Sequence, residues 1–440
     1  MSLLGDDVVW EVEPAGPLHG DVRVAGSKNA VTKLMVAGLL GDSPSWILNA
    51  PLVTEVDITA GMLTSIGAGV GREGDMVIVD PSDICTGSVP VGYFRTNRIP
   101  ILMMGPLLHR LGEVSVPLSG GDQIGGRPVD FHLDALRSFG AEVTITDDAI
   151  HAKATKLQGT RVRLPYPSVG ATETILLTAA VAEGRTVIEN AAMEPEVVEL
   201  ALFLQRMGAG IEMRPDRRYV IEGTTKLSGA RQELGGDRIE AFSYLVAGLA
   251  TGGRVRVSGC SQDRLVTALS TLRRMGASFD ITEESVTVEP SELRSIAVGT
   301  STHPGFMTDW GPPLVVLFTQ VPGMSVLHET VFEDRLGYVE ALDAMGAQVE
   351  LYDQCLGGGP CRFHETDWRH SAVVRGRTQL RGGRMEMPDI RAGFAYILAA
   401  AVADGPSTIR GIHQLERGYD RVHEKFAELG LRIQEFGSAN

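Results

Sequence analysis

The stretch Leu204-Gln205-Arg206-Met207-Gly208-Ala209 is one of six copies of a short phrase, and these copies decide the fold. In every copy a leucine or phenylalanine stands four residues before a glycine, and the six glycines are Gly67, Gly140, Gly208, Gly276, Gly346 and Gly430. A glycine just past an apolar helical stretch is the usual left-handed terminator of a helix. Alternating residues follow it, as in Glu142–Ile145, and predict a strand. The spacing of about 70 residues therefore indicates an internal repeat.

A second element precedes each phrase by about one helix and one strand. It is an apolar helix that ends on glycine, at Val36–Gly41, Gly105–Gly112, Ala179–Gly184, Ala247–Gly252, Leu317–Gly323 and Ala399–Gly405. These first helices carry almost no charge, so we expect them to be buried on all sides, whereas the charged second helices should lie outside. Each repeat therefore predicts strand, helix, strand, helix and two strands, which is an α/β architecture.

The length of the chain predicts two domains. Its 440 residues exceed the ~250–300 residues over which one hydrophobic core keeps growing. Six repeats fit two domains of three repeats each, with a boundary near Gly235-Gly236. We expect the first domain to span residues 27–235, with a mobile loop at 118–130. The second should combine residues 236–440 with residues 1–26.

The composition excludes several function classes. A formal net charge of −15 argues against nucleic acid or an anionic membrane as a general partner, because both select basic surfaces, but it still allows a small anionic substrate. No run of ~18 uncharged apolar residues predicts a membrane span, and Met1–Trp10 lacks a secretory signal pattern. The four cysteines do not make a disulfide framework in a chain of this length, so we expect a reducing, cytoplasmic location.

Function is expected where the copies depart from their common pattern, and four segments do so. Gly26–Ala30 turns from a strand into a helix start, where backbone N–H groups and Lys28 favour an anion. A capped helix start with a surface lysine fits equally well. Leu118–Asp130 holds four glycines and predicts a mobile loop that carries Asp122 and Arg127. The alternative is a plain surface loop.

The other two departures place charged residues beside helix starts. Asp309 precedes an apolar helix, and an N-cap is the simplest interpretation because aspartate is favoured there. Asp389-Ile390-Arg391 and Glu416-Arg417 place arginines beside acids at equivalent points, and isolated pairs of this kind are usually surface salt bridges. Arg98, before another apolar helix, completes a set of four arginines and one lysine.

Together these segments resemble the UDP-N-acetylglucosamine enolpyruvyltransferase family, which performs the first committed step of peptidoglycan synthesis. The resemblance runs from about residue 17 to 431 and rests on six motifs in order: Gly26–Ala30, Gly120–Asp130, Ser168–Thr172, Glu189–Ala192, Thr330–Glu333 and Arg417–Tyr419. It implies two inside-out α/β barrel domains, each of three βαβαββ repeats, with the active site in the interdomain cleft. It also implies a 1-carboxyvinyltransferase that moves the enolpyruvyl group of phosphoenolpyruvate to a hydroxyl of a uridine nucleotide. Phosphate is released, and no cofactor or metal ion is implied.

The resemblance assigns residues to three tasks. Catalysis falls to Lys28, Asp122, Asp309 and Asp389, with Asp309 as the base for the attacking hydroxyl and Asp122 as the acid of the loop. Phosphoenolpyruvate binding falls to Lys28, Arg98, Arg127, Arg391 and Arg417, because arginine binds oxyanions in a bidentate fork. Nucleotide binding falls to Asn29, Arg127, Pro128, Val129, Asp130, Ser168, Val169, Gly170, Asp309 and Val331.

One departure from the family pattern lies in the loop, where the usual cysteine is Asp122. An aspartate can donate the proton if burial raises its pKa well above ~4. It cannot be alkylated as a thiolate can, so we expect fosfomycin to leave the protein active.

The residues expected to bind the acceptor depart further from the family pattern. The uracil-side residues Arg127–Asp130 match the family, but other positions lose polar or basic residues, at Tyr166, Met193, Ala241–Ser243 and Trp310–Pro313. These losses predict a smaller acceptor such as uridine monophosphate, as in family members of nucleoside-antibiotic biosynthesis. UDP-N-acetylglucosamine in peptidoglycan synthesis is the alternative. A nucleotide-binding protein without chemistry is a third, which the retained acids and cations oppose. The sequence indicates neither the acceptor hydroxyl nor the oligomeric state.

The sixth repeat is longer than the others, and the excess lies in residues 353–372. It holds Cys355 and Cys361, with His364 and His370 nearby, and these are potential zinc ligands. The five residues between the cysteines exceed the usual spacing of about two to four. A solvated loop is therefore the preferred interpretation, and no metal ion is predicted.

Overall fold

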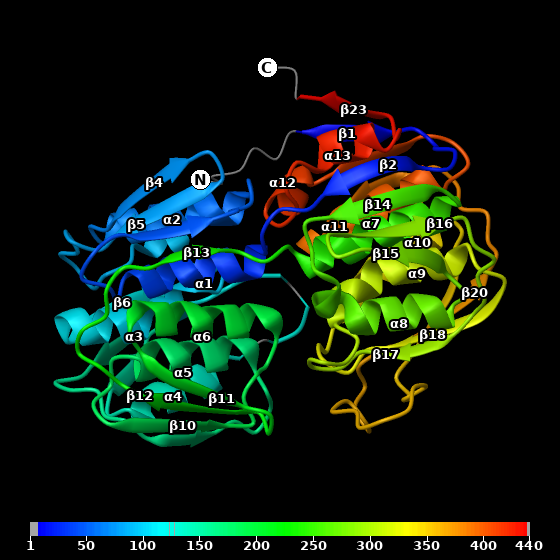
Figure 1. The fold of residues 1–440 in the computed structure, drawn as a ribbon. Helices are drawn as coiled ribbons and strands as arrows, with labels where there is room; N and C mark the ends of the chain where they lie inside the picture. The colour runs from blue at the N-terminus through cyan, green and yellow to red at the C-terminus, as the bar shows by residue number, and fades with distance from the viewer. Residues whose placement is uncertain (1–7, 123, 127, 438–440) are drawn as a thin grey trace. The chain divides into compact units, whose positions relative to one another are not determined.

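The computed structural model describes residues 8–122, 124–126 and 128–437. The chain divides into two compact units, each with most of its contacts inside itself (Figure 1). The N-terminal unit comprises Gly26–Gly121 and Arg127–Leu234, and the C-terminal unit comprises Met1–Ala25, Asp122–Gly126 and Gly235–Asn440. The sequence placed the whole loop in the first domain, whereas the described residues of its tip are grouped with the C-terminal unit. The domain boundaries expected from the sequence stay a prediction.

The N-terminal unit contains three repeats. Its helices are α1 (Lys28–Gly38), α2 (Thr54–Ser65), α3 (Ile99–Leu111), α4 (Asp130–Ser138), α5 (Val169–Ala179) and α6 (Pro195–Met207), with a 3₁₀ turn at Val91–Tyr93. Its strands are β3 (Ser45–Leu48), β4 (Gly69–Glu73), β5 (Met76–Asp80), β6 (Glu113–Pro117), β7 (Glu142–Ile145), β8 (Ala149–Lys153), β9 (Arg161–Arg163), β10 (Arg185–Glu189), β11 (Gly210–Arg214), β12 (Arg218–Glu222) and β13 (Arg231–Glu233). They form sheets in the orders β13-β3-β5-β4, β6-β8-β7 and β11-β12-β10-β9.

The C-terminal unit repeats the plan. Its helices are α7 (Arg238–Thr251), α8 (Val266–Arg274), α9 (Gly311–Thr319), α10 (Val339–Ala344), α11 (Ile390–Ala401), α12 (Ile412–Glu416) and α13 (Val422–Glu428), with 3₁₀ turns at Gln262–Leu265, Thr308–Trp310 and Arg335–Tyr338. Its strands are β1 (Val9–Val12), β2 (His19–Arg23), β14 (Arg254–Ser258), β15 (Ser278–Ile281), β16 (Ser285–Glu289), β17 (Ala297–Gly299), β18 (Gly323–His328), β19 (Gln348–Tyr352), β20 (Ser371–Gly376), β21 (Arg384–Glu386), β22 (Ser407–Arg410) and β23 (Ile433–Phe436). They form sheets in the orders β21-β22-β1-β23, β15-β16-β14-β2 and β17-β18-β20-β19.

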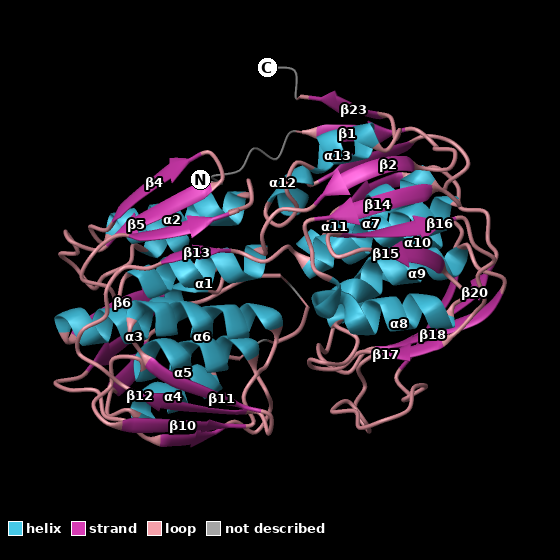
Figure 2. Ribbon diagram, in the orientation of Figure 1, coloured by secondary structure: helices cyan, strands magenta, loops and turns pink. Residues whose placement is uncertain are grey.

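One helix of each repeat lies in the core of its unit, and the sheets lie outside (Figure 2). Every residue of α9 and of α11 is buried, as the absence of charge on the first helices predicted. The outer helices are amphipathic: α8 buries Ala268, Leu269, Thr271 and Leu272 and exposes its charges. Burial of each large aliphatic side chain stabilises the fold by about 1.5–3 kcal/mol, so the central helices anchor each unit.

These features confirm the inside-out α/β fold. Within the described residues the sheets stay separate, and their strands do not hydrogen-bond into one closed barrel. No helix in that part of the chain is both long and apolar enough to cross a membrane.

The six glycines of the repeated phrase all end helices as predicted. Their φ angles lie between +91° and +115°, a conformation that glycine adopts without steric cost. The residue after each glycine donates its N–H to the carbonyl of the leucine or phenylalanine five positions earlier, as Ala209 does to Leu204 at 3.0 Å. This is the Schellman arrangement, in which such a bond satisfies a carbonyl at the end of the helix. The repeated phrase is therefore a signal that ends a helix.

Two strands from the start of the described chain complete the C-terminal unit. β2 pairs in parallel with β14, and β1 pairs antiparallel with both β22 and β23. These ladders place the segment before Gly26 among the sheets of the C-terminal unit.

Candidate functional site

Two acids that the sequence singled out lie at the amino ends of buried helices in the C-terminal unit. Asp309 lies in the 3₁₀ turn Thr308–Trp310, which leads into α9. Asp389 is the N-cap of α11, and its Oδ1 accepts hydrogen bonds from the N–H groups of Arg391 at 2.8 Å and Ala392 at 3.1 Å. The N-cap bond explains why α11 begins there.

Arg335 joins these two acids, and the sequence reasoning missed it. Its Nη1 lies 3.1 Å from Asp389 Oδ1, its Nη2 lies 3.3 Å from Asp309 Oδ1, and its side chain is only 1% exposed. Burial opposes the guanidinium charge, but the surrounding carboxylates outweigh burial and raise the pKa of Arg335 above its ordinary value. The result is a permanent cation between two acids. Its position two residues past the motif Thr330–Glu333 was the one available clue.

Asp389 is ionised at neutral pH. Burial raises its pKa, but the charge of Arg335 and the N–H donors of α11 outweigh burial and hold the pKa below the ordinary range of a carboxyl group. Asp389 therefore does not donate a proton at neutral pH. Its charge fixes Arg335, and Arg335 in turn positions Asp309.

Arg391 supplies a second buried cation beside Asp309. It is 3% exposed, and its Nε lies 3.8 Å from Asp309 Oδ2. Its guanidinium carbon lies 5.1 Å from the centre of the Tyr419 ring. Its Nη1 has no hydrogen-bond partner among the described residues. A buried donor without an acceptor is costly, so this atom is suited to an oxyanion.

Glu329, also missed by the sequence reasoning, holds the turn that carries Asp309. Its carboxylate accepts hydrogen bonds from the hydroxyls of Thr300 at 3.0 Å and Thr308 at 2.8 Å, and from the N–H of Val331 at 2.7 Å. Burial raises the pKa of Glu329. Because Thr308 directly precedes Asp309, these bonds limit the movement of the acid.

The tip of the glycine-rich loop packs against the same region. The carbonyl of Ile124 accepts a hydrogen bond from the N–H of Asp334 at 3.2 Å. Gly125 has a φ of +133°, which favours glycine, and a Cβ there would come within 2.2 Å of Glu333 Oε2, so a larger residue would also displace the glutamate side chain. The carboxylate of Asp122 contributes to the raised pKa of the buried arginine described above. The loop acid is thus brought into the same electrostatic environment as the other two acids.

In the N-terminal unit the predicted residues gather at the amino ends of its three buried helices. Lys28 and Asn29 are half-buried and begin α1. Arg98 immediately precedes α3, and its Nη2 donates a hydrogen bond to the carbonyl of Pro128 at 3.3 Å. Ser168 is the N-cap of α5 and accepts an N–H bond at 3.4 Å. Amino ends of helices favour anions, because their N–H groups and dipole are positive there.

Other predicted nucleotide-binding residues follow these positions. Val129 and Asp130 begin α4, and Val169 and Gly170 form the first turn of α5. Nearby His132 is neutral, because burial, together with the charge of Arg98, lowers its pKa to about 3. Arg127 lies outside the described residues.

Arg417 lies in the C-terminal unit, next in sequence to a glycine that approaches Arg391. It is half-buried at the carboxyl end of α12, and its Nη1 donates a hydrogen bond to Gln414 Oε1 at 3.1 Å. Gly418 lies beside Arg391, since a Cβ on Gly418 would stand 3.7 Å from Arg391 Nη1. Arg417 is therefore next in sequence to a residue that contacts the candidate oxyanion site.

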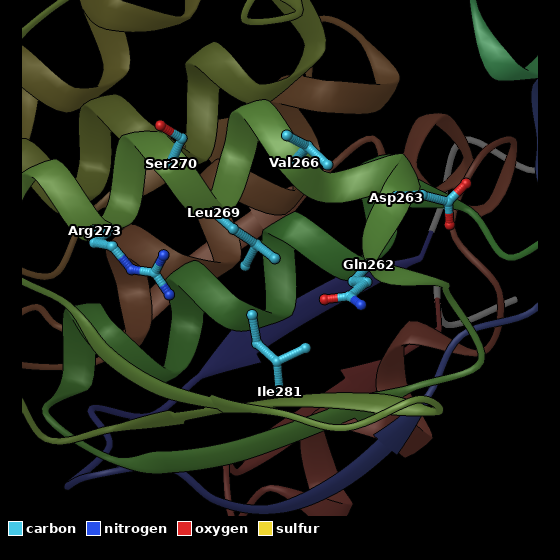
Figure 3. A pocket seen from close by; sticks show the side chains of 7 residues that line it. All are labelled: Gln262, Asp263, Val266, Leu269, Ser270, Arg273 and Ile281. Carbon is cyan, nitrogen blue, oxygen red and sulfur yellow. The ribbon is translucent and has the colours of Figure 1, made fainter.

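A surface pocket of the C-terminal unit lies away from all of these residues. It is lined by residues of a 3₁₀ turn, α8 and β15, namely Gln262, Asp263, Val266, Leu269, Ser270, Arg273 and Ile281 (Figure 3). None of the predicted site residues contributes to it. We therefore assign it no part in catalysis.

The chain is similar to enolpyruvyl transferases over nearly its whole length. The family model described as EPSP synthase (3-phosphoshikimate 1-carboxyvinyltransferase) matches residues 12–426. The UDP-N-acetylglucosamine 1-carboxyvinyltransferase of Protochlamydia amoebophila is 43% identical over 95% of this chain and 92% of its own. That of Chlamydia pneumoniae is 42% identical over 97% of this chain and 95% of its own. The chain belongs to the enolpyruvyl transferase family.

Solved structures agree on the fold of this enolpyruvyl transferase. The enolpyruvyl transferase NikO from Streptomyces tendae matches with a TM-score of 0.87 and 24% identity, covering 99% of this chain and all of that one. The EPSP synthase of Acinetobacter baumannii matches with a TM-score of 0.73 and 17% identity, covering 98% of this chain. At these identities the likeness shows the fold alone.

The side chains gathered in the C-terminal unit suit enolpyruvyl transfer. An enolpyruvyl group carries a carboxylate, which calls for a cation, and its transfer calls for a proton acceptor and a proton donor. Asp122, Asp309 and Asp389 provide carboxylates, and Arg335 and Arg391 provide buried cations. The individual roles of these residues remain predictions.

Proposed function

We propose that this enolpyruvyl transferase moves the carboxyvinyl group of phosphoenolpyruvate to a hydroxyl of UDP-N-acetylglucosamine and releases phosphate. The observation that supports this choice of acceptor is the 43% identity, over 95% of this chain, to a relative named for that substrate. The donor follows from the enolpyruvyl transfer itself and from the cations at the helix ends.

Arg391 is the proposed partner of the phosphoenolpyruvate carboxylate. Its Nη1 is buried and without a hydrogen-bond partner among the described residues, and a carboxylate would satisfy that donor. Lys28, Arg127 and Arg417 are proposed to bind the phosphate. Arg98 is proposed to hold the backbone beside Arg127, since it donates to the Pro128 carbonyl.

The proposed reaction is addition followed by elimination. Asp309 takes the proton of the acceptor hydroxyl, and the oxygen forms a bond to C2 of phosphoenolpyruvate while Asp122, which has to be protonated for this step, protonates the methylene carbon. A tetrahedral ketal results. The Asp122 carboxylate then takes a proton back from the methyl group, the bond between C2 and the phosphate oxygen breaks as Asp309 returns its proton to the departing phosphate, and the carbon–carbon double bond is restored. Asp389 stays ionised and keeps Arg335 in place.

Two residues in the stretches that the sequence analysis interpreted as losses on the acceptor side are core residues. Trp310 is 1% and Phe242 0% exposed. Their ring centres lie 5.3 Å apart, and the indole N–H of Trp310 donates to the carbonyl of Arg238 at 3.1 Å. These side chains repack the core of the C-terminal unit. They therefore give little support to a smaller acceptor, and UDP-N-acetylglucosamine becomes the preferred one.

Uridine monophosphate remains a second candidate because of Tyr166. Its carbonyl accepts the N–H of Ser168 at 2.7 Å, and both residues are half-buried at the start of α5. The family resemblance implies a lysine at this position for a diphosphate. A tyrosine supplies no cation there, which favours a nucleotide with fewer phosphates.

The test is to mix the protein with phosphoenolpyruvate and either UDP-N-acetylglucosamine or uridine monophosphate, and to follow phosphate release together with the mass of the product. A carboxyvinyl adduct on the UDP-sugar is expected. An adduct on the monophosphate alone would show that uridine monophosphate is the acceptor instead. The absence of an adduct on either nucleotide would contradict enolpyruvyl transfer to them. Asp309→Asn should abolish phosphate release, whereas Asp263→Asn, at the remote surface pocket, should not change it.

A further inference from the structure

Four side chains of metal-binding type meet in the C-terminal unit, and none of them is among the candidate catalytic residues described above. They are His328 at the end of β18, Cys355 and Cys361 in the inserted segment, and His370 immediately before β20. One ligand atom from each lies within 4.8 Å of the others. The sequence analysis named both cysteines and His370, but paired them with His364 instead of His328.

The two histidines are fully buried. Each is 0% exposed, and neither ring nitrogen of His328 has a hydrogen-bond partner among the described residues. Buried polar groups in proteins are nearly always satisfied, so an unpaired imidazole needs an explanation. A bound ion would supply one.

His370 is already oriented as a ligand. Its Nδ1 lies 2.7 Å from the carbonyl oxygen of Trp368, so Nδ1 carries the proton and donates it. Its Nε2 therefore presents a lone pair, and it lies 3.4 Å from the sulfur of Cys355. Histidine ligands of metals commonly donate their second ring N–H to a backbone carbonyl in this way.

The inserted segment is shaped to reach the histidines. The N–H of Phe363 points to the sulfur of Cys361 at 3.4 Å. The hydroxyl of Ser371 ties the segment to β20 by donating to the carbonyl of Gln354 at 2.7 Å. Gly357 crosses so close to His328 that a Cβ would come within 2.4 Å of its Nδ1. A glycine is required at that crossing.

We propose that His328, Cys355, Cys361 and His370 bind one zinc ion in a tetrahedral site. Two thiolates and two imidazoles are a usual ligand set for structural zinc, with Zn–S near 2.3 Å and Zn–N near 2.0–2.1 Å. Those lengths put neighbouring ligand atoms roughly 3.3–3.8 Å apart, and the observed cluster needs only a small contraction to reach them. The long spacing between the cysteines is accommodated because β18 supplies a ligand from outside the segment.

The zinc ion would secure the segment that supports the loop. Arg362, which follows Cys361, pairs with Glu333 at 2.7 Å, and Glu333 is the residue against which Gly125 packs. His328 is followed by Glu329, which fixes the turn of Asp309. The site is thus structural, and it connects two elements of the candidate catalytic region.

The test measures metal in the purified protein and in two pairs of variants. Cys361→Ser and Cys355→Ser remove ligands. Cys85→Ser changes a cysteine in the other unit, and His364→Asn changes the exposed histidine of the same segment. We expect about one zinc ion per chain in the wild type and in both control variants. The ligand variants should bind zinc at least about tenfold more weakly.

Replacement of zinc by Co²⁺ gives a second measurement that does not depend on the variants folding. A tetrahedral site with two thiolates should show sulfur-to-cobalt charge-transfer bands and intense d–d bands. Failure of the wild type to bind either ion from a stoichiometric solution would overturn the proposal. So would loss of metal in His364→Asn, or a disulfide between Cys355 and Cys361 in protein purified without oxygen.

Discussion

Asp122 is the acid of the loop, and its carboxylate cannot perform the chemistry of a thiol. A thiolate attacks an epoxide readily, and a carboxylate does so poorly. We expect the wild type to keep its activity after incubation with fosfomycin. Asp122→Cys should lose activity and gain the mass of one inhibitor molecule, as measured by mass spectrometry of the intact protein. An inhibitor adduct on the wild type, which retains its four native cysteines, would contradict this account.

Asp389 should make stability depend on pH in a defined direction. Its pKa in the folded chain is held below the ordinary value, chiefly by Arg335 against the effect of burial. A carboxyl group with a lowered folded pKa stabilises the protein above its unfolded pKa of about 4 and loses that contribution as the pH falls through the folded value. The free energy of unfolding of the wild type should therefore fall in acid.

Asp389→Asn isolates this contribution, because asparagine can still cap α11. The difference in unfolding free energy between wild type and variant should be largest near neutral pH and should shrink below about pH 4. Urea unfolding at several pH values measures it. A difference that does not change with pH would show that the charge of Asp389 contributes nothing.

Arg335 should be far more important for stability than a surface arginine in a similar pair. Arg335→Gln leaves two acids beside a site that is 1% exposed, and removal of one partner of a buried pair costs about 3–5 kcal/mol. Arg375→Gln breaks a pair with Glu350 whose side chains are 49% and 54% exposed, and should have a much smaller effect, because exposed ion pairs contribute little to stability. Urea unfolding of both variants compares them, and equal losses would argue against the buried pair.

At the scale of elements, the glycines of the loop differ in what they allow. Gly120 lies so close to Arg95 that a Cβ would stand 1.9 Å from its carbonyl oxygen, whereas a Cβ on Gly126 would meet nothing within 4 Å. Gly120→Ala should therefore displace the loop that carries Asp122. A displacement of about 1 Å can cost about a hundredfold in rate, so kcat should fall steeply.

Gly126→Ala is the matched control for this experiment, because it adds the same methyl group to the same loop without a clash. Its kcat should stay within about twofold of the wild type, since substitutions without a steric conflict have small effects. Steady-state kinetics of both variants are sufficient. If the two alanine variants lose activity equally, loop flexibility matters more than the close contact at Gly120.

The elements themselves were predictable because their determinants are local. The six glycine terminators and the uncharged first helices could be recognised within a few residues of sequence, and both take the expected form. Contacts between distant segments were not predictable in this way. Arg335 is important because it reaches Asp389, 54 residues away, and no local pattern encodes that pairing.

The part of the acceptor argument that rested on Trp310 lost its support for a related reason. Trp310 lies next to a predicted catalytic acid, and its place in a stretch that is polar in the family was interpreted as a change at the acceptor. In the structure the turn directs it into the core, where it packs on Phe242 and Phe306. Neighbouring positions in a 3₁₀ turn point in different directions, and the sequence alone did not indicate which one faces the site.

At the scale of the whole chain, the first strands are structural parts of the C-terminal unit. Deletion of residues 1–25 removes β1 and β2 and leaves unpaired edges on β14, β22 and β23. Amide hydrogen exchange should become faster in those three strands, because their hydrogen bonds lose a partner. Exchange in β10 and β12 of the N-terminal unit is the internal reference. Equal acceleration in both units would mean that they do not unfold separately.

The antiparallel pairing of β1 with β23 has a consequence for protein engineering. Val9 stands opposite Phe436 in that ladder, so the two ends of the described chain are neighbours in one sheet. A short peptide can bridge them, and the polypeptide can then be reopened at an exposed turn such as the one between β11 and β12. Such a circular permutant would carry its new termini in the N-terminal unit. Fluorescent labels or fusion partners could then be attached to that unit while β1 and β23 remain paired.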